Sequence, residues 1–294
     1  MAGIFFQTGE NYNIRKEKIV KVTEYSGTES IEIQDVTNNS RNISDYIKLS
    51  KHEFCDKKTG EIYKYKINNI KSSQSVKKSM NKLDKLMRNN FSGASNEIFV
   101  TLTTADNIAD VDTINSYFKK FWRKLKNRYS EYGLEYIYII EMQQLRQSWH
   151  IHSIIKSTTK KKLFIDNQII QQLWNKGNTK TSRIREHSSV EIDEELAIDG
   201  KVPKLFMVTE QLGIDKIIEY MTKLRTKDNL PSGKRVYYKS KGIENPKIQK
   251  IQYKDIKDII DAKYQLQSER TTLIKSTKTG AIVNKIKTET WKKR

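Results

Sequence analysis

Two neighbouring β-prone segments constrain the fold of this chain more than any other feature. Residues 135–143 (EYIYIIEMQ) and 149–156 (WHIHSIIK) are rich in isoleucine, tyrosine and other strand-forming residues, and only a short polar connection separates them. Strands joined by so short a connection pair with each other in antiparallel orientation. The sequence therefore predicts an antiparallel hairpin near the middle of the chain.

Helical and strand patterns alternate around this hairpin. In several segments apolar residues recur every three or four positions, which is typical of helices with one buried face. Helices are expected over 74–90, from Asp110 or Asp112 to about Leu125, from Asp166 to a stop at Gly177, and from Asp215 to Arg225. Short strands are expected over 97–104, over 189–193 and, after a turn at Pro231, within the sequence VYYKS.

The two ends of the chain differ from this middle part. Residues 1–73 contain β-prone stretches around 14–22, 30–36 and 61–67, but no motif that indicates a function. From Pro246 onward the chain has 13 Lys plus Arg against 5 Asp plus Glu and no clear β pattern. We expect an N-terminal extension (1–73), a central domain (74–245) and a basic C-terminal appendage (246–294) that starts as a helix and frays towards its end.

The charge of the chain points to a polyanionic partner. Lys plus Arg number 55 against 35 Asp plus Glu, a formal net charge of +20, which favours nucleic acid because phosphate contacts release condensed counterions. No apolar run approaches the roughly 20 residues that span a bilayer, so we expect a cytoplasmic protein that does not bind membranes. A single cysteine, Cys55, excludes an internal disulfide framework and a cysteine-rich zinc site.

A pair of histidines lies within the second strand of the hairpin. Residues at positions i and i+2 of a strand point to the same face, so the imidazoles of His150 and His152 can reach one metal ion. Glu141 and Gln143 share a face of the neighbouring strand, and a buried carboxylate is costly unless it is paired or binds a cation. Two imidazoles and a carboxylate suit Mg²⁺ or Mn²⁺ in phosphoryl transfer. The alternatives are a structural histidine pair and a solvated Glu141 bonded to Arg146.

Such a metal site needs a nucleophile, and one of the 15 tyrosines is a candidate. Tyr220 lies on the helix expected from Asp215 to Arg225, with Lys216 and Lys223 one turn away in either direction and Lys227 a turn further on. Nearby cations stabilise a developing phenolate and hold a phosphate. The Tyr-x-x-Lys spacing is weak by itself because it also occurs at Tyr63, Tyr117 and Tyr238, and the alternative is a tyrosine at the edge of the core.

Taken in order, these residues resemble the HUH endonuclease superfamily, in particular the rolling-circle replication initiators (Rep proteins) of Gram-positive bacterial plasmids and single-stranded DNA phages. FVTLTT at 99–104 looks like the first strand motif of the family. HIH at 150–152 matches its His-hydrophobic-His metal motif, and YMTK at 220–223 matches its tyrosine and lysine motif. The resemblance spans about residues 75–245 and includes the basic helix after the first motif and the segment GKRVYYKSKG at 233–242.

The resemblance implies an α+β fold, with a central antiparallel β-sheet flanked by helices, between the β-rich N-terminal extension and the basic C-terminal tail. It implies a Mg²⁺ or Mn²⁺ ion held by His150, His152 and Glu141. It also implies attack by Tyr220, assisted by Lys223, on one DNA strand, which leaves a 5′-phosphotyrosine and a free 3′-hydroxyl. Tyr63 and Tyr117 precede the histidines and so do not fit the family's order, whereas Tyr238 follows them but lies in a strand pattern.

One departure concerns the connection between Glu141 and His150. The family often has glycine there, whereas this chain has QQLRQSW, so the third metal ligand stays open between Glu141 and Gln143. The cations expected to contact DNA are Lys216, Lys227, Arg235, Lys239 and Lys241.

The expected partner is single-stranded or hairpin DNA at a replication origin in the bacterial cytoplasm. The chain has no GxxxxGK[ST] phosphate loop, so unwinding is expected to come from a host helicase. A relaxase or a transposase of the same superfamily is the nearest alternative. A non-catalytic nucleic-acid-binding protein, with tyrosines for stacking and lysines for phosphate contact, is the alternative from another class.

Overall fold

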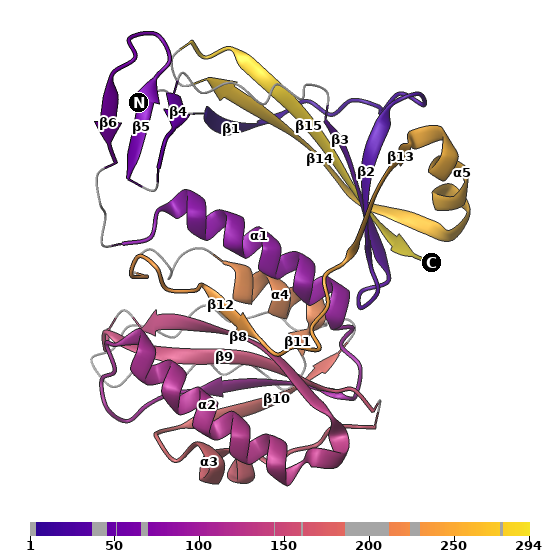
Figure 1. Ribbon diagram of the computed structural model, residues 1–294. Coiled ribbons are helices and arrows are strands. Elements are labelled where there is room, and N and C mark those ends of the chain that lie inside the picture. The colour runs from indigo at the N-terminus through magenta and orange to yellow at the C-terminus, as the bar shows by residue number, and fades with distance from the viewer. Residues whose placement is uncertain are drawn as a thin grey trace. The chain divides into compact units, whose positions relative to one another are not determined.

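A computed structural model describes residues 4–36, 46–50, 52–65, 70–143, 145–159, 161–185, 212–223, 230–276 and 279–294 (Figure 1). The chain forms two compact units. Residues Met1–Ile67 and Pro246–Arg294 make up the first unit, and Asn68–Asn245 make up the second. No helix among the described residues has both the length and the apolar character needed to cross a membrane.

The second unit contains a six-stranded sheet with the order β11-β10-β7-β9-β8-β12. Its strands are β7 (Glu97–Leu102), β8 (Leu134–Gln143), β9 (Ser148–Ser157), β10 (Thr179–Arg185), β11 (Leu212–Gly213) and β12 (Tyr237–Lys239). β8 and β9 form the expected antiparallel hairpin, and of the described pairings in this sheet only that of β10 with β11 is parallel. The predicted α+β class with an antiparallel sheet is confirmed.

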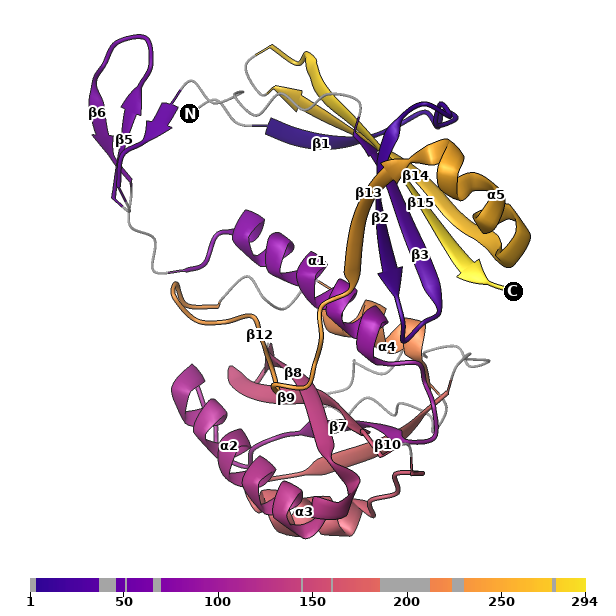
Figure 2. The same cartoon turned by 45° about the vertical axis from the view of Figure 1, so that its right-hand side comes forward.

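Helices cover both faces of this sheet. Helices α1 (Ser73–Asn90) and α4 (Ile214–Thr222) lie on one face, and α2 (Val111–Arg128) and α3 (Asn167–Trp174) lie on the other (Figures 1 and 2). Their apolar stripes pack into one core that includes Leu83, Phe118, Ile170 and Ile217. The hairpin β8–β9 is therefore buried on both faces, which explains its nearly continuous apolar sequence.

Side-chain caps set where these helices begin. Ser72 accepts a hydrogen bond from the backbone N–H of Ser75 at the start of α1. Asp110 accepts from the N–H groups of the first turn of α2, and Asp166 does so for α3. A cap of this kind contributes about 1 kcal/mol because it satisfies backbone donors that have no partner within the helix. The two aspartates were both among the caps expected from the sequence.

The expectation that Gly177 ends the third helix is wrong. Helix α3 ends earlier, at Trp174, and its C-cap Asn175 adopts the left-handed conformation (φ 46°) that asparagine tolerates. Gly177 instead lies against the chain after β7, where an added Cβ would come within 2.5 Å of the backbone oxygen of Thr103. Glycine is needed there because the N–H of Ala105 donates to the oxygen of Lys176 at 2.7 Å and holds the two backbones together.

Other expected elements differ in position. The strand expected at 189–193 lies outside the described residues, and the strand after α3 is β10. The C-cap of α4 is Lys223, so this helix ends before the expected Arg225, and residues 224–229, with Lys227, lie outside the described part. The turn at Pro231 is present, with the N–H of Lys234 donating to the oxygen of Pro231, and β12 follows it.

The first unit joins the two ends of the chain in one antiparallel six-stranded sheet with the order β1-β14-β15-β3-β2-β13. Its strands are β1 (Ile4–Gly9), β2 (Ile19–Tyr25), β3 (Ser30–Val36), β13 (Lys247–Gln252), β14 (Tyr264–Ser276) and β15 (Ile282–Lys293). Helix α5 (Tyr253–Lys263) packs on it through Tyr253 and Ile260, which contribute to a small core with Val20, Ile33 and Trp291. A three-stranded sheet of β4 (Tyr46–Lys48), β5 (Glu53–Asp56) and β6 (Ile62–Lys64) also belongs to this unit.

The expectation of a C-terminal appendage without β structure is therefore wrong, although α5 is helical. Charged residues occupy buried positions of β15 where an apolar pattern would need apolar residues. Lys287 is only 1% exposed, and its Nζ donates to Glu269 Oε2 at 2.7 Å. Glu289 is also buried and accepts hydrogen bonds from Tyr253 and Trp291. Because these buried charges satisfy each other, the strands carry no readable alternation of apolar and polar residues.

Candidate metal and tyrosine site

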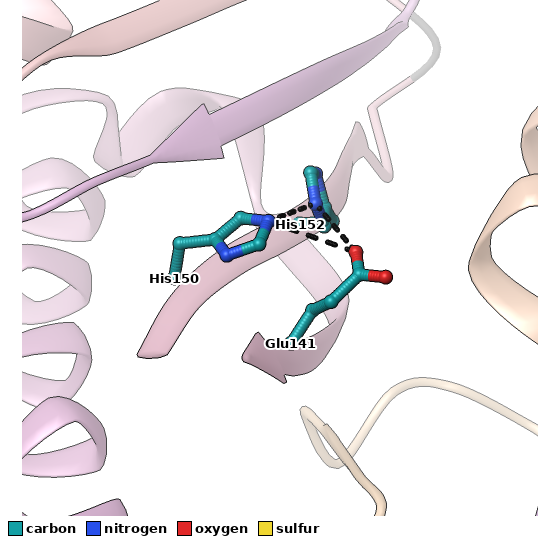
Figure 3. A group of neighbouring side chains, drawn as sticks. All are labelled: Glu141, His150 and His152. Atoms are coloured by element: carbon teal, nitrogen blue, oxygen red, sulfur yellow. Dashed lines mark hydrogen bonds and ion pairs between the residues drawn. The ribbon is translucent and has the colours of Figure 1, made fainter. Parts of the chain in front are cut away.

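Three potential metal ligands converge on the α4 side of the second unit's sheet. Strand β9 carries His150 and His152 on one face, and the antiparallel register places Glu141 of β8 directly opposite His150. The three side chains point toward one another (Figure 3). Glu141 Oε2 lies 3.0 Å from His152 Nε2 and 3.6 Å from His150 Nε2, and the two Nε2 atoms are 2.7 Å apart. One ligand atom from each residue lies within 4.8 Å of the other two.

The protonation of His150 fits a metal ligand. Burial, and then the neighbouring His152, lower the pKa of His150 to about 3, although Glu141 opposes this shift. His150 is therefore neutral near pH 7, which is the state that binds a metal ion. Its Nδ1 atom is buried without a hydrogen-bond partner in the described part of the chain. The donor set of two imidazole nitrogens and one carboxylate oxygen thus fits a divalent cation.

His152 is held in place by two residues of β7. Thr101 lies opposite His152 in the register, and its Oγ1 is 3.1 Å from His152 Nδ1. The ring of Phe99 stacks parallel to the imidazole, with ring centres 5.8 Å apart. A hydrogen bond from Nδ1–H to Thr101 leaves the Nε2 lone pair directed at the cluster. The role of Thr101 was not expected from the sequence, which shows only a polar residue inside an apolar strand and not the register that pairs it with His152.

Helix α4 brings Tyr220 to the same cluster. The Tyr220 hydroxyl lies 2.9 Å from His152 Nε2, and the two rings are perpendicular with centres 5.0 Å apart. Burial, then the charge of Glu141 and a hydrogen bond to it, raise the pKa of Tyr220. Ile217 and Met221 are fully buried, which fixes the rotation of α4 and directs Tyr220 at the sheet. The hydroxyl is therefore protonated at neutral pH and in contact with the ligand cluster.

Tyr238, which shares the Tyr-x-x-Lys spacing, faces away from the cluster. It pairs with Tyr138 of β8 and stacks on its ring, with centres 4.9 Å apart. Its hydroxyl accepts a hydrogen bond from Asn115 Nδ2 of α2 at 2.7 Å. Because side chains alternate along β8, Tyr138 and Tyr238 lie on the α2 side of the sheet, whereas Glu141 lies on the other side.

Tyr237, next to it, lies on the side of the cluster. Tyr237 is opposite Ile139 of β8, and Ile139 is opposite His152 of β9. Its side chain is half-buried at the edge of the sheet. Sequence reasoning missed Tyr237 because the choice between two adjacent tyrosines depends on the register of β12 against β8.

The alternative third ligand and the alternative partner of Glu141 lie further along the hairpin. Gln143 is on the face of Glu141 but two residues further on, opposite Ser148. Arg146, which the alternative interpretation paired with Glu141, donates from Nη2 to the backbone oxygen of Ala105 at 2.6 Å. Glu141 itself faces the two imidazoles.

The cations expected to assist Tyr220 or to contact DNA lie in different environments. Lys223 is exposed at the C-cap of α4. Lys216 is exposed and lies 3.7 Å from Glu219. Lys239 donates from Nζ to the backbone oxygen of Ile243 at 2.6 Å, so it stabilises the chain locally. Arg235 and Lys241 are exposed to solvent.

Comparison with known proteins gives one match. A family model described as replication-associated protein ORF2 matches residues 97–192, about a third of the chain, from β7 to beyond β10. The matched segment contains Glu141, His150 and His152, whereas Tyr220 lies after it. No curated protein and no solved structure matches the chain significantly. The match supports a role in the initiation of DNA replication.

Proposed function

We propose that this protein is a divalent-metal-dependent nickase that initiates rolling-circle replication by cutting one DNA strand with a tyrosine. The observation that carries the proposal is the position of the Tyr220 hydroxyl, 2.9 Å from Nε2 of His152, within a cluster that also contains His150 and Glu141. A hydroxyl nucleophile beside a cation-binding donor set is the arrangement that phosphodiester transfer requires.

In this proposal His150, His152 and Glu141 hold a Mg²⁺ or Mn²⁺ ion, and Glu141 rather than Gln143 is the third ligand. The bound ion would supply Lewis-acid polarisation of the scissile phosphate. Tyr220 Oη attacks phosphorus and forms the phosphotyrosine bond as the bond from phosphorus to the 3′-oxygen breaks. Overall, one proton moves from the phenol to the leaving 3′-oxygen. The phosphodiester energy is kept in the new bond, so the strand can later be rejoined.

The cations near Tyr220 are proposed to hold the substrate. Lys223 follows the last residue of α4, and its exposed side chain can extend to a phosphate near the phenol. Lys216, Arg235 and Lys241 are proposed to contact the strand on either side, together with Lys227. The substrate is single-stranded or hairpin DNA at an origin, and a host helicase would separate the strands.

The direct test is formation of a covalent adduct. Purified protein is incubated with Mn²⁺ and labelled single strands from its candidate origin, and adducts are resolved on a denaturing gel. We expect one strand to become attached and to release a fragment with a free 3′-hydroxyl, and a chelator to prevent both. Tight binding of every strand without any adduct would contradict the proposal and favour a non-catalytic DNA-binding protein.

Thr101→Val is expected to weaken metal binding. Valine keeps the shape of threonine but cannot accept the hydrogen bond from His152 Nδ1, so the imidazole loses its fixed orientation. Loss of such a partner lowers metal affinity by roughly 10–100-fold. Titration of Mn²⁺ followed by electron paramagnetic resonance measures this directly. Ser153→Ala is the control: it removes a buried hydroxyl that bonds Ile137 on the other face of β9, and Mn²⁺ affinity should not change. Wild-type affinity in Thr101→Val would exclude the orienting role.

Replacing Arg235 and Lys241 with glutamine is expected to weaken DNA binding without stopping the reaction. Each phosphate contact to a single strand contributes about 0.7 to the slope of log affinity against log salt. The double variant should therefore lose up to about 1.4 from that slope, yet form adduct at the wild-type rate on saturating oligonucleotide. The charge-retaining variant Arg235→Lys with Lys241→Arg should keep the slope. An unchanged slope in the glutamine variant would make these residues bystanders.

A further inference from the structure

The outer face of α2 carries an unusual concentration of positive charge. Over two and a half turns the exposed side chains include those of Lys119, Lys120, Arg123, Lys124, Lys126 and Arg128, and the helix has one acidic residue, Asp112, in its first turn. We call these six basic residues the α2 basic face. Within the described residues, none of the six takes part in an ion pair.

This arrangement does not help the helix to fold. Lys120 and Lys124 are four residues apart, as are Lys124 and Arg128, so like charges face each other along one row of the helix. Such pairs destabilise a helix. The helix is instead anchored by its apolar side, where Phe118 and Leu125 are fully buried. A partner that neutralises these charges would explain why the helix carries them although they repel each other.

The α2 basic face and the metal cluster lie on opposite sides of the sheet. Trp122 and Phe118 pack against Tyr136 of β8, and Phe118 also contacts Tyr138. Glu141 lies on the other face, as the alternation of side chains along β8 requires. A DNA strand held at Tyr220 would therefore have to pass around an edge of the sheet to reach α2.

The chemistry of this surface fits phosphates and offers little to bases. Two aromatic side chains of α2 border this face, and both are partly buried: Tyr117 packs against Trp174, and Trp122 packs against Tyr136. Helix α2 therefore offers no fully exposed ring for base stacking. The six cations extend over about 15 Å of helix, along which a duplex presents a phosphate charge about every 1.7 Å. Contacts of this kind hold and orient DNA without reading its sequence.

We propose that the α2 basic face binds the sugar-phosphate backbone of duplex DNA, as a second DNA contact separate from the strand that is cut. The duplex is that which flanks the cleavage point, and this part of the inference rests on the proposed function. The surface tethers the protein to double-stranded DNA while the opposite face of the sheet acts on one strand.

The test compares variants that each lose two charges. The first variant carries Lys120→Gln and Lys124→Gln on α2. The control variant carries Lys254→Gln and Lys263→Gln on α5, where Asp255, Asp258 and Asp261 offset the charge of the lysines. Binding to a labelled duplex without origin sequence is measured by fluorescence anisotropy over a range of salt concentrations, with chelator present so that no cleavage occurs. For α2 we expect the salt slope to fall by about 1.8, or 0.9 per contact, and affinity at low salt to fall at least ~10-fold. The α5 variant should match the wild type.

Two further measurements separate a binding role from a structural one. The melting temperature of the α2 variant should not fall, because the substitution removes like-charge repulsion. Lys120→Arg with Lys124→Arg should retain the wild-type slope. If the salt slope of duplex binding is unchanged in the α2 glutamine variant, the inference is overturned, and the α2 basic face is exposed to solvent or binds an acidic protein. A loss confined to single-stranded DNA would overturn it as well.

Failure of the proposed function is visible separately. Adduct formation on a saturating single-stranded oligonucleotide should be the same for wild type and for the α2 variant, because Tyr220 lies on the other side of the sheet. If wild-type protein forms no adduct but the α2 variant still loses its duplex salt slope, the nickase proposal fails and the α2 inference stands.

Discussion

Tyr220→Phe is expected to abolish the covalent protein–DNA adduct, with a fall in the rate of strand cleavage of at least about 10³-fold. The substitution removes only the hydroxyl, which is the proposed nucleophile and lies 2.9 Å from His152 Nε2. The ring keeps its perpendicular packing on His152 and Phe99. The free energy of unfolding should therefore change by no more than about 1 kcal/mol, and DNA affinity should be nearly unchanged. Denaturing gels of the adduct and thermal unfolding measure the two effects.

The chain supplies two matched controls for this variant. Tyr238→Phe changes a tyrosine that shares the Tyr-x-x-Lys spacing but lies on the α2 side of the sheet, where its hydroxyl bonds Asn115. Tyr237→Phe changes a tyrosine on the same side as the cluster. Both variants should form adduct, and mass spectrometry of the wild-type adduct should find the nucleotide on Tyr220. Attachment to another tyrosine, or an adduct in Tyr220→Phe, would show that the nucleophile has been assigned incorrectly.

His150→Ala and His152→Ala are each expected to eliminate metal binding and cleavage while DNA binding persists. A divalent ion contributes several kcal/mol of transition-state stabilisation, which corresponds to a rate loss on the order of 10³-fold when it is absent. Each variant removes one of only three donors in the cluster. The cations proposed to contact DNA lie elsewhere, so affinity for the oligonucleotide should remain. Mn²⁺ titration, cleavage and DNA binding are measured on the same preparations.

His52→Ala is the control for the loss of an imidazole. His52 is exposed and belongs to the first unit, so its removal should leave Mn²⁺ affinity and cleavage unchanged. Chelated wild-type protein should behave like the two cluster variants. Cleavage at the wild-type rate by His150→Ala or His152→Ala, with metal present, would rule out the proposed ion site.

Local patterns were enough to predict the elements that carry the site. The apolar runs of β8 and β9, the short connection between them and the caps Asp110 and Asp166 each depend on residues close together in the sequence. The spacing of His150 and His152 placed both on one face, because the side-chain period of a strand is two residues. The grouping of the two imidazoles on one face could therefore be predicted from the sequence alone.

Only part of the first unit could be predicted in this way: the β-prone stretches at 30–36 and 61–67 contain β3 and β6, but the assembly of the large sheet was not expected. Its sheet pairs β15 with β3, so strands from the two ends of the chain are neighbours. Such pairing depends on contacts far apart in the sequence, which no local window contains. The inward-facing positions of β15 include Lys287 and Glu289, whose charges are satisfied only once β14 and α5 are in place. A pattern of this kind looks like a solvated basic tail when it is read alone.

By itself the sequence determined which side chains share a face of each strand or helix, because backbone geometry repeats every 2 or every 3.6 residues. Tertiary structure alone decided which faces meet. It placed Thr101 beside His152, put Tyr237 on the face of the sheet that carries the cluster and Tyr238 on the other face, and ended α4 before Lys223. The physical reason is that strand register and helix packing are set by the burial of the whole core, in which a shift of one residue reverses every side chain. The same non-local packing put the α2 basic face on the side of the sheet opposite Tyr220.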